Sequence, residues 1–290
     1  MKRCVACDRT WDSPAWTCPS CSWQPLERDG VLAFAPDQDD STSEYDAELS
    51  RLLAALEPRS FWFRSRNRLL LQVLGQDFGD ARSLLEIGCG TGFVLSAVAQ
   101  EYPRLQVAGG ELLAAGLEPA RERLPGAELF QLDARRLPWR EEWDVLGAFD
   151  VLEHIAEDEA VLTEMHAAAA PGGGVILTVP QHQWLWSDAD DRAHHKRRYA
   201  RQELVEKVSA AGFTVTRVTS FVSTLLPVMA ASRLVRRGSN GTDDLEAELC
   251  PPAPLSALFE TSLRAELALI RRGVSLPAGG SLLLVARRRD

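Results

Sequence analysis

The chain has 290 residues, of which 46% are hydrophobic, so it can bury one α/β core and still carry smaller appendages. The net charge of -9 excludes a global positive field that would attract nucleic acid. No apolar run reaches the roughly 20 residues that span a bilayer, and no secretion signal follows Met1, so we expect a cytoplasmic protein.

Two closely spaced cysteine pairs lie near the start of the chain. Cys4 and Cys7 form the first pair, and Cys18 and Cys21 form the second. The short spacing lets the thiolates converge on one ion, which predicts a structural zinc site. Disulfides are the alternative, although thiols stay reduced in the cytosol. Residues 1–35 are too few to fold unaided, so we expect zinc to stabilise this ribbon as a module with its own core, separate from the main domain.

Residues 36–80 are expected to form a linker and two helices. The stretch from Pro36 to Ser43 is rich in Asp and Ser, which is typical of a linker. Residues 44–56 and 60–74 then have apolar side chains at helical spacing, which predicts one helix in each segment.

An apolar strand next runs into a loop of alternating glycines. The strand covers residues 84–87, the glycines are Gly88, Gly90 and Gly92, and a helix is expected from Phe93. Glycines adopt positive φ and lack the Cβ that would block a ligand, so the loop predicts a nucleotide-like ligand at the helix N-terminus. A dinucleotide-binding loop is one alternative, but it needs a small residue where Phe93 stands. A glycine turn without a ligand is the other.

Three further strands are predicted to end in acidic residues. Glu111 closes a strand about twenty residues after the loop, where doubly wound folds place a carboxylate that accepts ribose hydroxyls. A strand at 127–132 ends in Asp133, and a strand at 143–149 ends in Asp150. A Pro-Gly-Gly-Gly turn at 171–174 precedes a fifth strand.

These landmarks resemble the class I S-adenosylmethionine (SAM)-dependent methyltransferases from Ser83 to Ser220. The resemblance implies an α/β class fold with a Rossmann-like, seven-stranded sheet, and SAM as the cofactor. It further implies that Asp133 bonds the adenine and that the segment from Asp150 to His154 borders the transferable methyl. The cofactor-binding residues implied in this way are Glu86, Gly88, Gly90, Gly92, Glu111, Leu112, Asp133, Ala134 and Asp150.

Residues 181–199, after the fifth strand, change from aromatic to acidic to basic. The patterns that begin at Trp186-Ser187 and at His195 resemble bacterial methyltransferases related to the ubiquinone-biosynthesis O-methylating group. Aromatic side chains exclude water, and guanidinium groups bind carboxylates or phosphates, so we expect an anionic acceptor, small or lipid-linked. Helices before the domain cover the cofactor pocket in resembling enzymes. The candidate substrate-binding residues are Trp62, Arg64, Trp184, Trp186, Arg197, Arg198 and Tyr199.

Two alternatives stay open for the basic run, residues 192–198. It is either a solvated charge run or an internal ion-pair cluster with Asp188, Asp190 and Asp191. If the acceptor is a hydroxyl, a general base helps, and imidazole titrates near neutral pH. The candidate bases are His154, His194 and His195, and for each of them an orienting or packing role is the alternative.

The main domain is expected to cover residues 81–290 and to end in an antiparallel hairpin. Its final strand, 281–286, would pair with 212–220, which leaves residues 221–280 as a helical insertion. The apolar start of that insertion ends near Arg236 and Arg237, so it is a candidate for peripheral contact with the inner membrane surface. Core packing or a dimer contact is the alternative, and the oligomeric state is not predicted.

The sequence thus predicts SAM-dependent methyl transfer to an oxygen of an anionic metabolite of cell-envelope or quinone type. One alternative is an RNA methyltransferase whose ribbon presents the RNA, although the acidic composition argues against a nucleic-acid partner. A noncatalytic methyltransferase-like binding protein is the other. The intact glycine loop, Glu111 and Asp133 favour retained cofactor binding.

Overall fold

The computed structural model describes residues 1–28, 30–38, 44–235 and 249–289. The helices are η1 (Pro36–Gln38), α1 (Glu44–Leu56), α2 (Phe61–Asp77), α3 (Phe93–Glu101), α4 (Ala114–Arg123), η2 (Leu152–His154), α5 (Asp158–Ala168), η3 (Gln183–Leu185), α6 (Asp188–Arg192), α7 (Arg201–Ala210), α8 (Leu226–Val235) and α10 (Ala253–Arg271). The strands are β1 (Lys2–Arg3), β2 (Thr10–Trp11), β3 (Leu26–Arg28), β4 (Val31–Ala33), β5 (Ser83–Ile87), β6 (Gln106–Glu111), β7 (Glu128–Gln131), β8 (Trp143–Phe149), β9 (Ala169–Pro180), β10 (Phe213–Phe221) and β11 (Ser281–Arg288).

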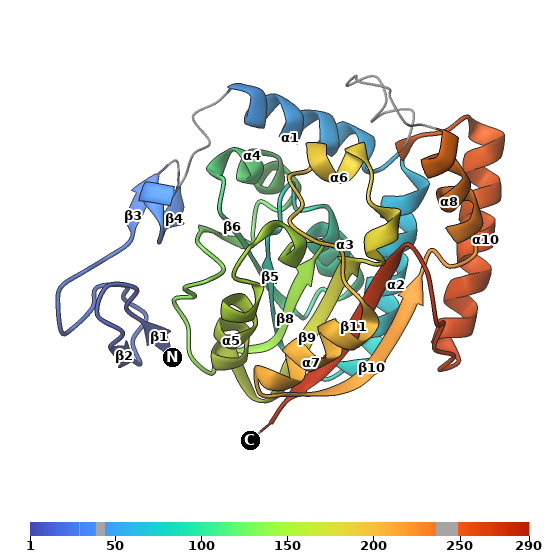
Figure 1. Ribbon diagram of the computed structural model, residues 1–290. Coiled ribbons are helices and arrows are strands. Elements are labelled where there is room, and N and C mark those ends of the chain that lie inside the picture. The colour runs from blue at the N-terminus through green and yellow to red at the C-terminus, as the bar shows by residue number, and fades with distance from the viewer. Residues whose placement is uncertain (29, 39–43, 236–248, 290) are drawn as a thin grey trace.

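A nine-stranded sheet in the order β10-β11-β9-β8-β5-β6-β7-β4-β3 forms the centre of the molecule (Figure 1). Strands β5 to β9 are parallel, and β11 lies antiparallel between β9 and β10. The predicted α/β Rossmann-like fold and its terminal hairpin are therefore confirmed, and the ribbon strands β3 and β4 extend the seven predicted strands to nine. The strand order reverses between β5 and β8, and such switch points open a ligand crevice at the carboxyl ends of the strands.

The predicted glycine turn at 171–174 lies inside β9 and not before it. The partner of β8 along β9 changes from Ala169, opposite Trp143, to Gly174, opposite Val145. The residues between Ala169 and Gly174 are therefore left out of the register. Gly172 has a φ of 74°, which favours glycine at this bulge.

Helices cover both faces of the sheet, and each face has its own core. Buried residues of α5 and α7 form one core with Phe34 and Phe130. Buried residues of α2, α3, α4 and α10 form the second core on the other face. The exposed positions of α3, α4 and α7 are mostly polar, which is the pattern of a three-layer α/β domain, whereas α10 also exposes Leu255, Leu258 and Leu269.

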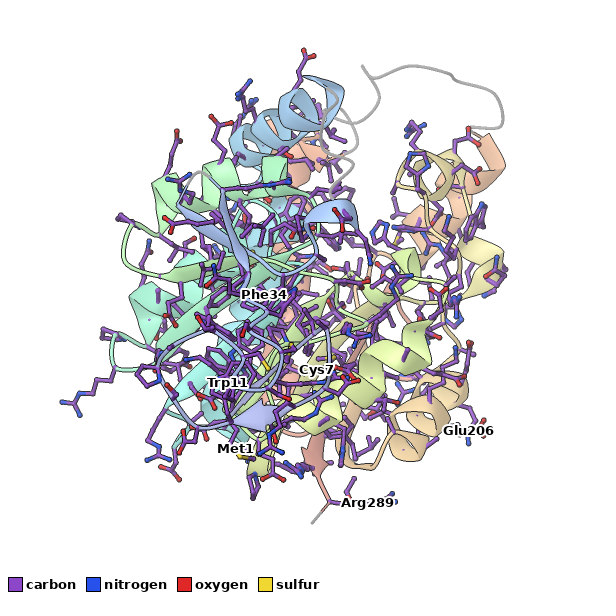
Figure 2. All side chains as sticks on the ribbon, turned by 90° about the vertical axis from the view of Figure 1, so that its left-hand side faces the viewer. Met1, Cys7, Trp11, Phe34, Glu206 and Arg289 are labelled. Carbon is purple, nitrogen blue, oxygen red and sulfur yellow. The ribbon has the colours of Figure 1, made fainter. Side chains whose placement is uncertain are left out.

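The N-terminal ribbon shares the core of the main domain. Strand β4 pairs in parallel with β7, with Leu32 opposite Phe130. Phe34 is buried, and the ring of Trp16 lies 4.7 Å from it. In Figure 2 the segment that carries Cys7 and Phe34 lies across the side of the domain that faces the viewer. The expectation of a separate core is wrong, because the aromatic residues beside the cysteine pairs pack on the sheet.

None of the helices within the described residues combines the length and the hydropathy needed to cross a bilayer. Helix α8 contains the apolar start of the predicted membrane-contact segment, and Val228 on it is half exposed. Arg236 and Arg237, the basic end of that segment, lie outside the described residues.

Candidate cofactor and acceptor site

The glycine loop between β5 and α3 has the predicted backbone. Gly88, Gly90 and Gly92 have φ values of 68°, 48° and 72°, where other residues are strained. A Cβ on Gly88 would lie 2.5 Å from the side chain of Val151, so the loop passes close to the segment after β8. A Cβ on Gly90 would meet nothing within 4 Å. The loop therefore leaves open space beside the backbone of Gly90.

Glu111 ties this loop to the end of β6. Its carboxylate accepts the backbone N–H groups of Gly90 at 3.0 Å and of Leu112 at 2.8 Å. Burial raises the pKa of Glu111, and the backbone N–H groups oppose that shift. A carboxylate accepts more than two hydrogen bonds, so it retains capacity for the ribose hydroxyls of a nucleoside bound against the loop.

Glu86 leaves a buried oxygen without a partner at the end of β5. The residue is only 3% exposed, and its Oε2 makes no hydrogen bond within the part of the chain that the structure describes. Burial raises the pKa of Glu86 to about 8, while the charge of Arg66 acts in the opposite direction. Because a buried acceptor without a donor is costly, this position fits the cationic amino group in the methionine part of SAM.

Asp150, after β8, is held by a residue that the sequence analysis did not identify. The Arg66 guanidinium lies 2.5 Å from the Asp150 carboxylate and 4.7 Å from the ring centroid of Trp62. Trp62 and Arg66 are four residues apart on α2 and therefore share a face. Arg66 could have been identified from this spacing, because a helix was predicted over these residues and Trp62 was already a candidate.

Asp133 and Ala134 lie after β7, as predicted for the adenine end of the site, and both are nearly buried. The Arg135 guanidinium bonds the Asp133 carboxylate, with Nη2 and Oδ2 2.9 Å apart. The same guanidinium donates to the side chain of Gln38 at 3.0 Å. Residues that follow the ribbon therefore reach this end of the site.

A second network fixes the loop from the other side. The Thr91 hydroxyl donates to the buried Glu57 carboxylate at 2.7 Å, and Arg123 bonds both residues. Glu57 follows α1 and Arg123 ends α4, so these two helices position the glycine loop. The sequence analysis missed this network, because three residues so far apart in the chain carry no joint signal.

The acceptor side brings together two of the three predicted bases. The rings of His154 and His195 lie 4.7 Å apart, and both lie against the buried side chain of Glu153. Burial and the charge of His195 lower the pKa of His154 to about 4. His194 is exposed and has a φ of 56°.

The basic run is largely engaged inside the protein. Arg198 is buried, and its guanidinium bonds both Asp190 oxygens, at 2.7 and 3.0 Å. Arg197 pairs with Asp158 at 3.0 Å, and the fully buried Tyr199 donates its hydroxyl to the same carboxylate at 2.6 Å. These contacts favour the internal ion-pair alternative over an acceptor contact, most clearly for Arg198 and Tyr199.

The predicted aromatic residues after β9 lie nearer the surface. Trp184 is 60% exposed, and its ring stacks on His182 at 5.4 Å. Trp186 donates its indole N–H to Asp191 at 3.0 Å. Helix α6, next along the chain, and helix α1 lie at the same end of the sheet in Figure 1. Trp184 thus has free surface for an acceptor, whereas the polar end of Trp186 is already paired.

Arg64, a predicted substrate residue, joins α2 to α10. Its guanidinium pairs with Glu260 at 2.5 Å, and Arg68 and Arg264 contact the same carboxylate. Although burial opposes the shift, these three arginines lower the pKa of Glu260 to about 2. The contacts give Arg64 a role in packing two helices together.

We expect Glu260→Gln to lower the free energy of unfolding at pH 7 by about 1 to 2 kcal/mol, because the neutral side chain no longer pairs with the three arginines. The loss is no larger because the arginines are partly exposed and solvent screens the pairs. The folded pKa of Glu260 lies below its ordinary value of 4.5, so this stability is present above pH 4.5 and is lost as the pH falls towards 2. Urea unfolding at pH 7 and pH 3 measures the difference. Glu118→Gln, which removes an exposed pair with Arg51, is the control and is expected to change little.

The four ribbon cysteines form one cluster. The Sγ atoms of Cys4 and Cys21 lie 3.6 Å apart, and so do those of Cys7 and Cys18. These distances are too long for disulfide bonds. Four thiolates around zinc, each about 2.3 Å from the metal, place sulfur atoms about 3.8 Å apart. The cluster therefore fits a tetrahedral zinc ion.

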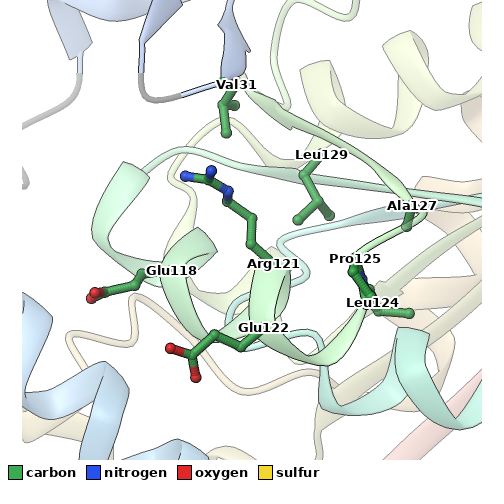
Figure 3. Close-up of a pocket in the computed structure, with 9 residues that line it drawn as sticks. Val31, Glu118, Arg121, Glu122, Leu124, Pro125, Ala127 and Leu129 are labelled. Atoms are coloured by element: carbon green, nitrogen blue, oxygen red, sulfur yellow. The ribbon is translucent and has the colours of Figure 1, made fainter.

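A cavity of about 500 Å³ lies apart from this site, between α4 and the β3–β4 hairpin. Figure 3 shows Arg121 and Glu122 of α4 on one side of the cavity and Val31 on the other. None of the predicted cofactor-binding residues lines it. The cavity lies where the ribbon contacts the main domain, and both acidic and basic side chains of α4 line it.

Comparisons with known proteins agree with this geometry. Residues 43–218 match the family model described as "Methyltransferase domain". Trans-aconitate 2-methyltransferase of Paracidovorax citrulli is 34% identical over 36% of this chain and 40% of its own length. A probable SAM-dependent methyltransferase of Mycolicibacterium smegmatis is 27% identical over 57% of this chain and 64% of its own length. This chain thus spans less than two thirds of either relative.

Phosphoethanolamine N-methyltransferase 2 of Haemonchus contortus, solved with SAM, is similar in fold. The TM-score is 0.52 and the identity 19%, over 77% of this chain and 53% of that one. At this identity the likeness shows the fold alone. Because the family model covers more than half of the chain, the chain belongs to the methyltransferase domain family and carries a class I SAM-dependent methyltransferase domain.

Proposed function

We propose that the protein transfers a methyl group from SAM to an oxygen of an anionic metabolite, small or lipid-linked. The observation that carries the proposal is the joint placement of Glu86, Gly90, Glu111 and Asp150 at the carboxyl ends of β5, β6 and β8, where the strand order switches. SAM supplies an activated methyl group on a sulfonium leaving group. The protein mainly has to align the acceptor and exclude water.

The residues divide this work along the crevice. Glu111 holds the ribose end, and the partnerless oxygen of Glu86 receives the amino group. Arg66 orients Asp150 at the methyl end, under the ring of Trp62. Trp184 has the free surface needed to cover the acceptor. We assign His154 and His195, whose rings lie 4.7 Å apart, to the acceptor side of the site.

An anionic acceptor is supported by one of the relatives. The Paracidovorax citrulli relative is named for trans-aconitate, a carboxylated metabolite. The resemblance to the ubiquinone-related group keeps quinone and envelope intermediates among the candidates.

We infer in addition that the ribbon cysteines bind one structural zinc ion. The sulfur distances fit a tetrahedral thiolate site, and four protein ligands leave no open position for chemistry. The role of the ion is then to hold the ribbon against the sheet edge.

A screen with methyl-labelled SAM tests the acceptor class. Cell extract is incubated with the protein and separated into lipid, small-molecule, protein and RNA fractions. We expect the label in a lipid or small-molecule fraction, bound to an acid or phosphate ester. A label found mainly in RNA would support the RNA alternative and contradict the proposal. Glu111→Ala protein serves as the control for label carried by other enzymes.

A further inference from the structure

We propose that Glu153, His154 and His195 bind a divalent transition-metal ion at the acceptor side of the crevice. The ion's suggested task, holding an anionic acceptor, rests on the proposed function, whereas metal binding itself does not. The three side chains come from η2 and from the segment after α6, so the fold brings together residues about forty positions apart.

The first support is the geometry of the three side chains. One ligand atom from each of Glu153, His154 and His195 lies within 4.8 Å of the other two. Glu153 is completely buried, and neither of its carboxylate oxygens has a hydrogen-bond partner among the described residues. A buried carboxylate without a partner is costly, and a cation between the three groups would remove that cost.

The second support is the group that holds His195. Its Nδ1 lies 2.8 Å from the Asp190 carboxylate, which leaves Nε2 as the free ring nitrogen. Asp190 is itself held by the buried Arg198 and by Ser187. Metal-binding histidines usually donate their second nitrogen to such a carboxylate, which fixes the ring and its tautomer. Arg198 and Asp190 would then act on the ion through His195.

The donor set indicates the class of metal. Two imidazole nitrogens and one carboxylate oxygen suit zinc and similar divalent ions, and they leave a coordination position open. Such an ion would neutralise Glu153, whose charge otherwise repels an anion. The open position would then receive a carboxylate, phosphate or hydroxyl oxygen of the acceptor. The ribbon site differs, because its four thiolates fill the coordination sphere.

Cobalt substitution of the full chain separates the two sites. The protein is stripped with a chelator under reducing conditions, and Co²⁺ is added. Thiolate-bound cobalt gives sulfur-to-cobalt charge-transfer absorption, whereas a site of nitrogen and oxygen ligands gives only weak bands. We expect two bound Co²⁺ ions in the wild type and one in Glu153→Gln and His195→Ala, with the charge-transfer absorption unchanged.

The control variant is His194→Ala, because His194 neighbours the site in sequence but is exposed and outside the cluster. It should bind as much cobalt as the wild type. Asp190→Asn should retain the second ion but bind it about 10 to 100 times more weakly. Circular dichroism and SAM binding, measured on each variant, report whether the main domain is folded.

Equal cobalt content in the wild type, Glu153→Gln and His195→Ala would overturn the inference. The proposed function would still stand if SAM bound normally. Conversely, loss of the second ion in these variants, in a protein that binds no SAM, would support the metal site and contradict the proposed function. If Glu153→Gln does not fold, His195→Ala alone decides between the two outcomes.

Discussion

Replacing Glu111 with Ala is expected to weaken SAM binding by about 10- to 100-fold, or roughly 1.5 to 3 kcal/mol. The proposed function gives this carboxylate the ribose contacts, which the variant would lose. The carboxylate also accepts the backbone N–H groups of Gly90 and Leu112, so its removal releases the loop. Isothermal titration calorimetry measures the change.

Two further variants make this test specific. Glu111→Gln keeps an oxygen acceptor but adds donors, so an intermediate affinity is expected. Glu118→Ala removes a carboxylate from the exposed face of α4 and should leave SAM affinity unchanged. Wild-type affinity in Glu111→Ala would contradict the assignment of the ribose end to Glu111, whatever the methyl transfer activity.

Replacing Cys4 and Cys18 with Ser is expected to destabilise the whole domain. Loss of a structural metal belongs to the small class of changes that exceed about 4 kcal/mol. For a chain of this size, that lowers the thermal midpoint by roughly 10 °C. Strand β4 pairs with β7 and Trp16 packs on Phe34, so the loss should spread into the sheet in one cooperative transition. SAM affinity should also fall, because Gln38 bonds Arg135 beside Asp133.

Differential scanning calorimetry of the wild type, the double variant and Cys250→Ser checks this prediction. Cys250 lies outside the ribbon, and its thiol makes a long contact with the Leu56 carbonyl, so its variant controls for the loss of a thiol. A midpoint unchanged in the double variant, or a separate low-temperature transition for the ribbon, would contradict the shared core.

Structural features that depend on a few neighbouring residues were predictable from the sequence. The glycines at 88, 90 and 92 have positive φ, and the strands that lead to Glu111 and Asp150 follow from short continuous apolar runs. These features depend on residues close in the chain. The terminal hairpin was also predicted, because the sheets of the class I methyltransferases that the sequence resembles end in an antiparallel hairpin.

Pairings between distant segments were not predictable from one sequence. The cysteine pattern identified the ribbon, yet nothing local shows that Leu32 lies opposite Phe130. Similarly, the basic run was predicted to bind an anion, but in the folded chain Arg198 forms an ion pair with Asp190. Arg66 and Glu153 were missed because their significance depends on what surrounds them once buried.

The central claim is that the crevice between β5 and β8 binds SAM. It is tested most directly by titrating the full chain with SAM and, in parallel, with NAD. We expect saturable one-to-one binding of SAM and no measurable binding of NAD, because Phe93 stands where a dinucleotide loop needs a small residue. Binding of NAD in preference to SAM, or no binding of SAM by folded protein, would contradict the account.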